Sequence, residues 1–239
     1  MRSWMCLSLP NSGSDWFANL VAQCTPGARY YHKEFFNPVT NWPHMEELAS
    51  VFGCELPSTA ANLYRQMHGM RDNEDETAML AVIDRTWRCQ QKWNCNKEVW
   101  SFGNAGIFKH RFVLWGLTRS ANTLFPPSRA RVWCWYDAIA CGAGILNTSI
   151  EFEQRCRHAH KVATELLLQD ADRHGFPVLE YDKIVSGTPD EVMQEIDKLC
   201  VRHSIVDGVD RDLLFRRVFD ERRPKLVQTQ GKPSASLPS

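Results

Sequence analysis

The first residues of the sequence that could bind an anion form a short polar run near its start. Pro10-Asn11-Ser12-Gly13-Ser14-Asp15 separates an apolar run from a segment with helical spacing. A loop between a strand and a helix presents backbone N–H groups and the positive end of the helix dipole to an anion. Gly13 would allow a close approach, and the hydroxyl groups of Ser12 and Ser14 would add donors. The composition is that of an ordinary turn or of a phosphate-binding loop, without the GxxxxGK[ST] pattern of nucleoside triphosphatases.

A second group with phosphate chemistry follows a later apolar run. The segment 111–117 has the composition of a buried strand, Arg119 follows it, and Ser128 lies at an expected helix start. A guanidinium can make bidentate contacts with a phosphate, and a serine at a helix start adds a hydroxyl group. By itself, Arg119 is better explained as a solvated charge at the end of a strand.

These residues need a scaffold in which strands alternate with helices. The spacing predicts strands over 3–9, 111–117 and 177–181, an extended piece near 29–36, and helices after Trp16 and over 128–146, 152–174 and 188–203. Ser14 or Asp15 is the expected N-cap of the first helix. Alternating elements predict an α/β domain with a mainly parallel sheet covered on both faces. Ligands of such sheets bind beyond the carboxyl ends of the strands, which places the loops 10–15, 118–128 and 182–188 around one crevice.

The chain reads as a single domain over residues 1–227. Residues 40–95 are expected to form a helical insertion on the acceptor side, and the tail 228–239 is expected to be disordered because it carries almost no large apolar residue. No internal repeat is present.

Composition excludes several classes of protein. The 28 basic and 28 acidic side chains cancel, whereas a polynucleotide-binding protein usually has a basic excess. Nine cysteines without a CxxC pair indicate free thiols in a reducing compartment. No signal peptide and no run of about 20 apolar residues is found, so a cytoplasmic location is expected. Cys156 and His160 could share a metal, but a helix face without a metal explains them better.

The polar run near the start resembles the 5′-phosphosulfate-binding loop of sulfotransferases that use 3′-phosphoadenosine 5′-phosphosulfate (PAPS). The matching segment is Ser8-Leu9-Pro10-Asn11-Ser12-Gly13-Ser14-Asp15-Trp16. The resemblance implies that residues 11–15 bind the 5′-phosphate side of the donor and that Trp16 stacks on the adenine. Two further matches follow in the family's order. Arg119 with Ser128 matches the pair that binds the 3′-phosphate, and Tyr181, in Val178-Leu179-Glu180-Tyr181-Asp182-Lys183-Ile184, matches a tyrosine near the adenine.

The resemblance implies a three-layer fold like that of the P-loop sulfotransferases, PAPS as donor, adenosine 3′,5′-bisphosphate (PAP) as product, and no metal. It implies transfer of a sulfuryl group to a hydroxyl or amine acceptor. The acceptor (a small molecule, carbohydrate or lipid, for example) and the oligomeric state are not indicated by any residue.

One departure from the family concerns Asn11, because the family has lysine or arginine there. That cation stabilises the leaving oxygen, and losing such a group costs about 10²–10³ in rate. Another cation would have to replace it, with Lys33, Lys97 and Arg129 as candidates, or the protein is slow, or it only binds the nucleotide. A non-catalytic nucleotide-binding relative is therefore the alternative. A small kinase is a weaker one, because the lysine-containing loop is absent.

Three side chains are candidates for the base that takes the acceptor proton. Glu34 lies in Tyr31-His32-Lys33-Glu34-Phe35-Phe36, which resembles a segment of trehalose 2-sulfotransferases that contains their catalytic glutamate. His32 is the second candidate. Glu98 is the third, because it lies near where cytosolic sulfotransferases carry their histidine base.

Overall fold

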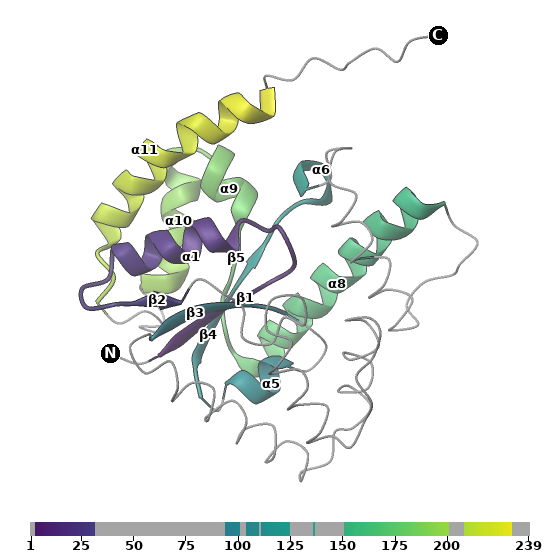
Figure 1. Ribbon diagram of the computed structural model, residues 1–239, viewed down its shortest axis with the longest axis horizontal. Coiled ribbons are helices and arrows are strands. Elements are labelled where there is room, and N and C mark those ends of the chain that lie inside the picture. Colours follow the sequence, from purple (N-terminus) through teal and green to yellow (C-terminus); the bar gives the residue numbers. More distant parts are fainter. Residues whose placement is uncertain are drawn as a thin grey trace.

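The described part of the protein is built on a sheet of five parallel strands (Figure 1). The computed structural model describes residues 3–31, 94–100, 104–109, 111–124, 136, 151–200 and 208–230. The strand order is β2-β3-β1-β4-β5. The strands are β1 (Trp4–Ser8), β2 (Tyr30–Tyr31), β3 (Cys95–Val99), β4 (Val113–Thr118) and β5 (Val178–Glu180). This order differs from the two common doubly wound orders, 3-2-1-4-5-6 and 2-1-3-4-5.

The central strand β1 fixes the register of the sheet. Cys6 lies opposite Lys97 of β3 on one side and Trp115 of β4 on the other. All five residues of β1 and all five of β3 are buried. A parallel strand that is covered on both faces is expected to be buried along its whole length. The prediction of an α/β protein with a parallel sheet is confirmed.

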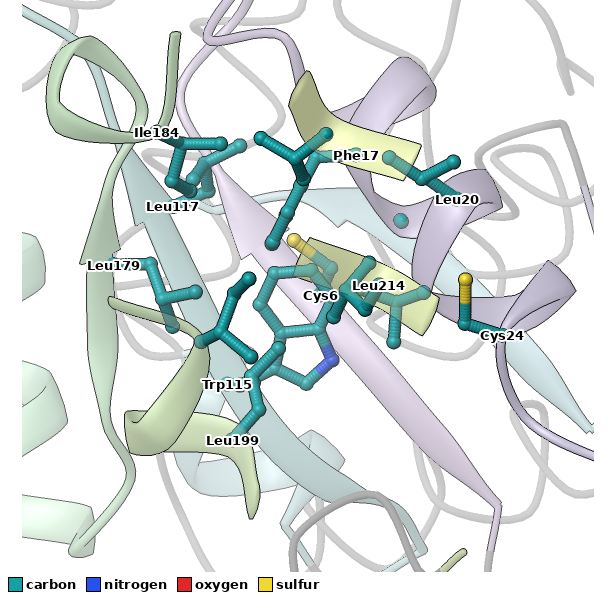
Figure 2. Close-up of a cluster of buried hydrophobic side chains, with 14 of the residues drawn as sticks. Cys6, Phe17, Leu20, Cys24, Trp115, Leu117, Leu179, Ile184, Leu199 and Leu214 are labelled. Carbon is teal, nitrogen blue, oxygen red and sulfur yellow. The ribbon is translucent and has the colours of Figure 1, made fainter. Parts of the chain in front are cut away.

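Among the described elements, four helices cover one face of the sheet. They are α1 (Ser14–Gln23), α9 (Tyr181–Ser186), α10 (Pro189–Cys200) and α11 (Arg211–Gln230). Figure 2 shows the core that they enclose, in which side chains of β1, β4 and β5 meet those of the helices. Its members include Cys6, Phe17, Leu20, Cys24, Trp115, Leu117, Leu179, Ile184, Leu199 and Leu214. This apolar layer holds the start of α1 in a fixed place over β1.

The opposite face is covered by α5 (Asn104–Phe108) and α8 (Phe152–His174). The buried side of α8 is formed by small and apolar residues, mainly Cys156, Ala159, Ala163, Leu167 and Ala171. This helix begins and ends where the sequence predicted, and Gly175 closes it with a left-handed φ of 72°. A short turn of helix, α6 (Ala121–Leu124), follows β4.

Several elements differ from the sequence prediction. The N-cap of α1 is Gly13, with φ 83°, and not Ser14 or Asp15, because this left-handed residue turns the chain into the helix. Tyr181 begins α9 instead of ending a strand, so most of the predicted loop 182–188 is helical. Strand β3 was not predicted. The last helix extends to Gln230, so residues 228–230 of the expected tail are helical.

Other predictions fall elsewhere in the chain. The helix expected over 128–146 and nearly all of the insertion over 40–95 lie outside the described residues.

The five cysteines in the described ranges are free thiols, and all but Cys200 are buried. Within those ranges no helix has the length and apolarity needed to cross a membrane.

Candidate functional site

The loop after β1 is a tight turn that aims the start of α1 at the carboxyl edge of the sheet. Asn11 and Gly13 both have left-handed backbones, with φ of 56° and 83°. The amide and the hydroxyl group of Ser12 both donate to the carbonyl of Leu9, at 3.3 and 2.7 Å. Phe17 N–H donates to the carbonyl of Gly13 at 3.1 Å, which begins the helix at that glycine. The first amides of a helix have no intrahelical acceptor, so this geometry suits an anion.

The ring of Tyr181 lies against Gly13. A Cβ atom at position 13 would overlap Cε2 of Tyr181, so only glycine fits this contact. Trp16 meets the same ring edge-on, with centroids 6.0 Å apart, and its Nε1 donates to Glu221 of α11 at 2.9 Å. Aromatic side chains from α1 and α9 therefore form one wall beside the loop.

Arg119, directly after β4, completes the group. Its guanidinium carbon lies 4.7 Å from the centroid of the Tyr181 ring, a cation–π distance. Its Nη1 donates to the carbonyl of Asn11 at 3.2 Å. Residues that follow β1, β4 and β5 are thus in contact at the carboxyl edge of the sheet.

The strand connections explain why the site forms there. After β1 the chain enters α1 on one face, and after β4 it continues through α6 to α8 on the other. β1 and β4 are neighbours, so their connections diverge between them. In parallel α/β sheets this point of divergence is where ligands bind. Asn11 and Arg119 lie on its two sides.

A buried cation lies at the start of α1. Lys97 of β3 makes an ion pair with Asp15, at 3.2 Å between Nζ and Oδ1, and the lysine side chain is only 9% exposed. Cys6 lies beside it in the sheet. Burial raises the pKa of the Cys6 thiol well above its usual value, and the charge of Lys97 opposes this rise only in part. The thiol is therefore protonated at neutral pH, and Lys97 is the charged group beneath the first turn.

Two neutral groups support the loop from the other side. The hydroxyl group of Tyr136 donates to the carbonyl of Pro10 at 3.3 Å, and its ring meets His160 of α8 edge-on at 5.0 Å. Burial raises the pKa of Tyr136 well above its usual value. Burial lowers the pKa of His160 from 6.5 to about 4, although Asp182 opposes the change. Sequence reasoning did not connect Tyr136 with the loop, because nothing in the spacing relates residues so far apart.

The residues predicted to bind the donor are largely together. Segment 11–16, Arg119 and Tyr181 form the group just described. Glu98 is 1% exposed, lies opposite Leu7, and faces away from α1 because its neighbour Lys97 faces toward it. The other predicted residues, Ser128, His32 and Glu34, and the alternative cations Lys33 and Arg129, lie outside the described residues.

No protein-family model, no curated protein and no solved structure matches this chain. Among the residues that the structure describes, no group of three or more histidine, cysteine, aspartate or glutamate side chains is arranged to hold a metal ion.

Proposed function

We propose that this protein is a sulfotransferase that moves a sulfuryl group from PAPS to a hydroxyl or amine acceptor. The observation that carries the proposal is the position of Arg119, between the carbonyl of Asn11 and the ring of Tyr181. The sequence resemblance assigns these three segments to one nucleotide, and their contact at one sheet edge supports that assignment.

Different described residues would bind different parts of the donor. The amides at the start of α1 would bind the 5′-phosphosulfate side, the guanidinium of Arg119 the 3′-phosphate, and Trp16 with Tyr181 the adenine. In the reaction an acceptor oxygen or nitrogen forms a bond to sulfur while the bond from sulfur to the bridging oxygen breaks. The acceptor proton passes to a base, and PAP leaves with the electron pair of the broken bond.

Asn11 is the reason for the alternative proposal, in which the protein binds PAPS without transferring its sulfuryl group. The amide side chain of Asn11 carries no charge to stabilise the leaving oxygen. Lys97 is the replacement cation that the geometry favours, because its ammonium group contacts Asp15 in the first turn of α1. Because Asp15 offsets part of the lysine charge, Lys97 would stabilise the leaving oxygen less well, which favours the alternative of binding without transfer.

Calorimetric titration with PAP, with ATP as the control, tests the donor site. The proposal expects micromolar affinity for PAP and much weaker binding of ATP. Failure of the folded protein to bind PAP would end the proposal. Magnesium-dependent turnover of ATP would instead favour a kinase.

A second assay separates transfer from binding alone. Release of PAP from PAPS is followed with a panel of hydroxyl and amine acceptors, for the wild type and for Asn11→Lys. Acceptor-dependent release by the wild type supports a sulfotransferase. Release by Asn11→Lys alone would favour the non-catalytic relative.

A further inference from the structure

The turn after β4 is fastened to α9 by both carboxylate oxygens of Asp182. Oδ2 accepts a hydrogen bond from the backbone N–H of Ser120 at 2.6 Å. Oδ1 accepts one from the hydroxyl group of Thr123, also at 2.6 Å. Short bonds of this kind to an ionised group are among the stronger ones in proteins. Asp182 therefore fixes both ends of the turn 120–123.

Thr123 in turn holds the guanidinium of Arg119. Its carbonyl accepts from Nη2 at 2.8 Å, and its hydroxyl oxygen accepts from Nε at 3.3 Å. Thr123 has one hydroxyl proton, and Asp182 at 2.6 Å is a nearer acceptor than the Ser120 carbonyl at 3.1 Å. With the proton directed at the carboxylate, the lone pairs of the oxygen face Arg119.

A second helix fastens the same turn. Nη1 of Arg157, in α8, donates to the carbonyl of Ala121 at 3.4 Å, and Nε of Arg157 contacts Glu153 at 3.0 Å. The turn is thus held by α8 as well as by α9.

We infer that Asp182 and Thr123 are positioning residues that hold the Arg119 guanidinium at the loop in the orientation that binds an anionic ligand. This inference rests on the proposed donor site. An arginine side chain has many rotamers, and a rigid partner removes most of that freedom before the ligand arrives. Binding then costs less conformational entropy, and the affinity of the ligand rises.

Titration with PAP tests the inference through four variants. Asp182→Asn and Thr123→Val should each raise the Kd about tenfold, because each removes a hydrogen bond to a charged group. Thr123→Ser retains the hydroxyl group and should restore binding to within about twofold of the wild type. Asp172→Asn is the matched control, because Asp172 is an exposed aspartate of α8, and it should bind like the wild type.

The coupling to Arg119 separates a positioning role from a merely structural one. In an Arg119→Lys background, Asp182→Asn should weaken PAP binding by less than about twofold, because the fork that it orients is gone. A tenfold loss in that background would overturn the inference, since the carboxylate would then act on binding without Arg119.

A ligand-free readout distinguishes failure of this inference from failure of the proposed function. The Nε–H resonance of Arg119, identified by its loss in Arg119→Lys, should be protected from exchange with water in the wild type and in Thr123→Ser. It should lose protection in Asp182→Asn and Thr123→Val. That pattern in a protein that does not bind PAP would end the donor proposal and leave the positioning role standing. Unchanged protection in Asp182→Asn would overturn the positioning role whatever the protein binds.

Discussion

The two ends of strands β4 and β5 carry polar clusters of different construction. Where the chain leaves these strands, Arg119 and Tyr181 meet the left-handed turn at Asn11 and Gly13. Where the chain enters them, Lys109 precedes β4 and His174 precedes β5. Nζ of Lys109 lies 3.2 Å from Nδ1 of His174. We call the first group the exit cluster and the second the entrance cluster.

The entrance cluster also includes Asp170 of α8 and Trp100, which follows β3. Nε2 of His174 lies 3.2 Å from Asp170, and the other oxygen of Asp170 accepts from Nε1 of Trp100 at 2.9 Å. Burial lowers the pKa of His174, and Lys109 lowers it further, while Asp170 opposes the change. Every described member is thus satisfied by another side chain. The exit cluster instead combines helix amides, a strained backbone and a guanidinium, which suits a ligand. At one end of these strands the side chains therefore satisfy one another, whereas the other end has the geometry on which the proposed donor site rests.

The largest effect is expected at Gly13 of the exit cluster. Gly13→Ala should reduce the free energy of unfolding by about 3 kcal/mol, because the methyl group would overlap the Tyr181 ring and the backbone is left-handed. Gly27→Ala is the matched control, since Gly27 has φ 76° and no atom within 4 Å of a Cβ atom. Urea denaturation measures both variants. Equal losses in the two would show that backbone strain, and not the contact with Tyr181, explains the glycine.

The next largest effect is expected at His160, where the free energy of unfolding should depend on pH. Its pKa is about 4 in the folded protein and 6.5 in the unfolded chain, so the unfolded chain binds more protons between these values. The contribution of His160 to the free energy of unfolding is therefore neutral above pH 6.5 and becomes increasingly unfavourable to folding as the pH falls toward 4. Between about pH 7 and about pH 5 the free energy of unfolding should fall by about 2 kcal/mol through this residue.

Urea denaturation at both pH values, on the wild type and on His160→Gln, isolates this contribution. The glutamine variant should lose most of the dependence, because it does not titrate in this range. An equally steep dependence in the variant would mean that other groups cause it.

A smaller effect is expected in the entrance cluster. Asp170→Ala should cost about 1.5 kcal/mol of stability, because it leaves the N–H groups of Trp100 and His174 without their acceptor. The variant should bind PAP like the wild type. Asp172→Ala, at an exposed position two residues later, should change neither property. Weaker PAP binding by Asp170→Ala would remove the distinction between the clusters.

Elements with a strong local pattern were predictable from the sequence. Helix α8 has the expected bounds because apolar spacing runs its whole length and Gly175 ends it. The start of α10 at Pro189 follows from the Thr188 capping box, in which Glu191 and Thr188 exchange hydrogen bonds. Strand β1 was found because an apolar run directly precedes a polar turn.

Strand β3 shows why other elements were not predictable. Its sequence, Cys95-Asn96-Lys97-Glu98-Val99, is polar, yet all five residues are buried. Burial of Lys97 depends on Asp15, a residue distant in the sequence, and no local pattern contains that partner. The same holds for Tyr136 beneath Pro10 and for Asp182 beside Thr123. The loop and Arg119 could be recognised from their residue types and their order along the sequence. The side chains that hold them in place could be identified only from the three-dimensional structure.

The most direct test of the central claim, that the exit cluster binds the nucleotide, is one titration across both clusters. PAP binding is measured for the wild type, Arg119→Ala and Lys109→Ala, each of which removes one cation from one end of the same strands. We expect Arg119→Ala to weaken binding about 100-fold, as expected for the loss of one partner of a charge pair, and Lys109→Ala to leave it unchanged. Equal weakening by both variants, or by neither, would contradict the claim.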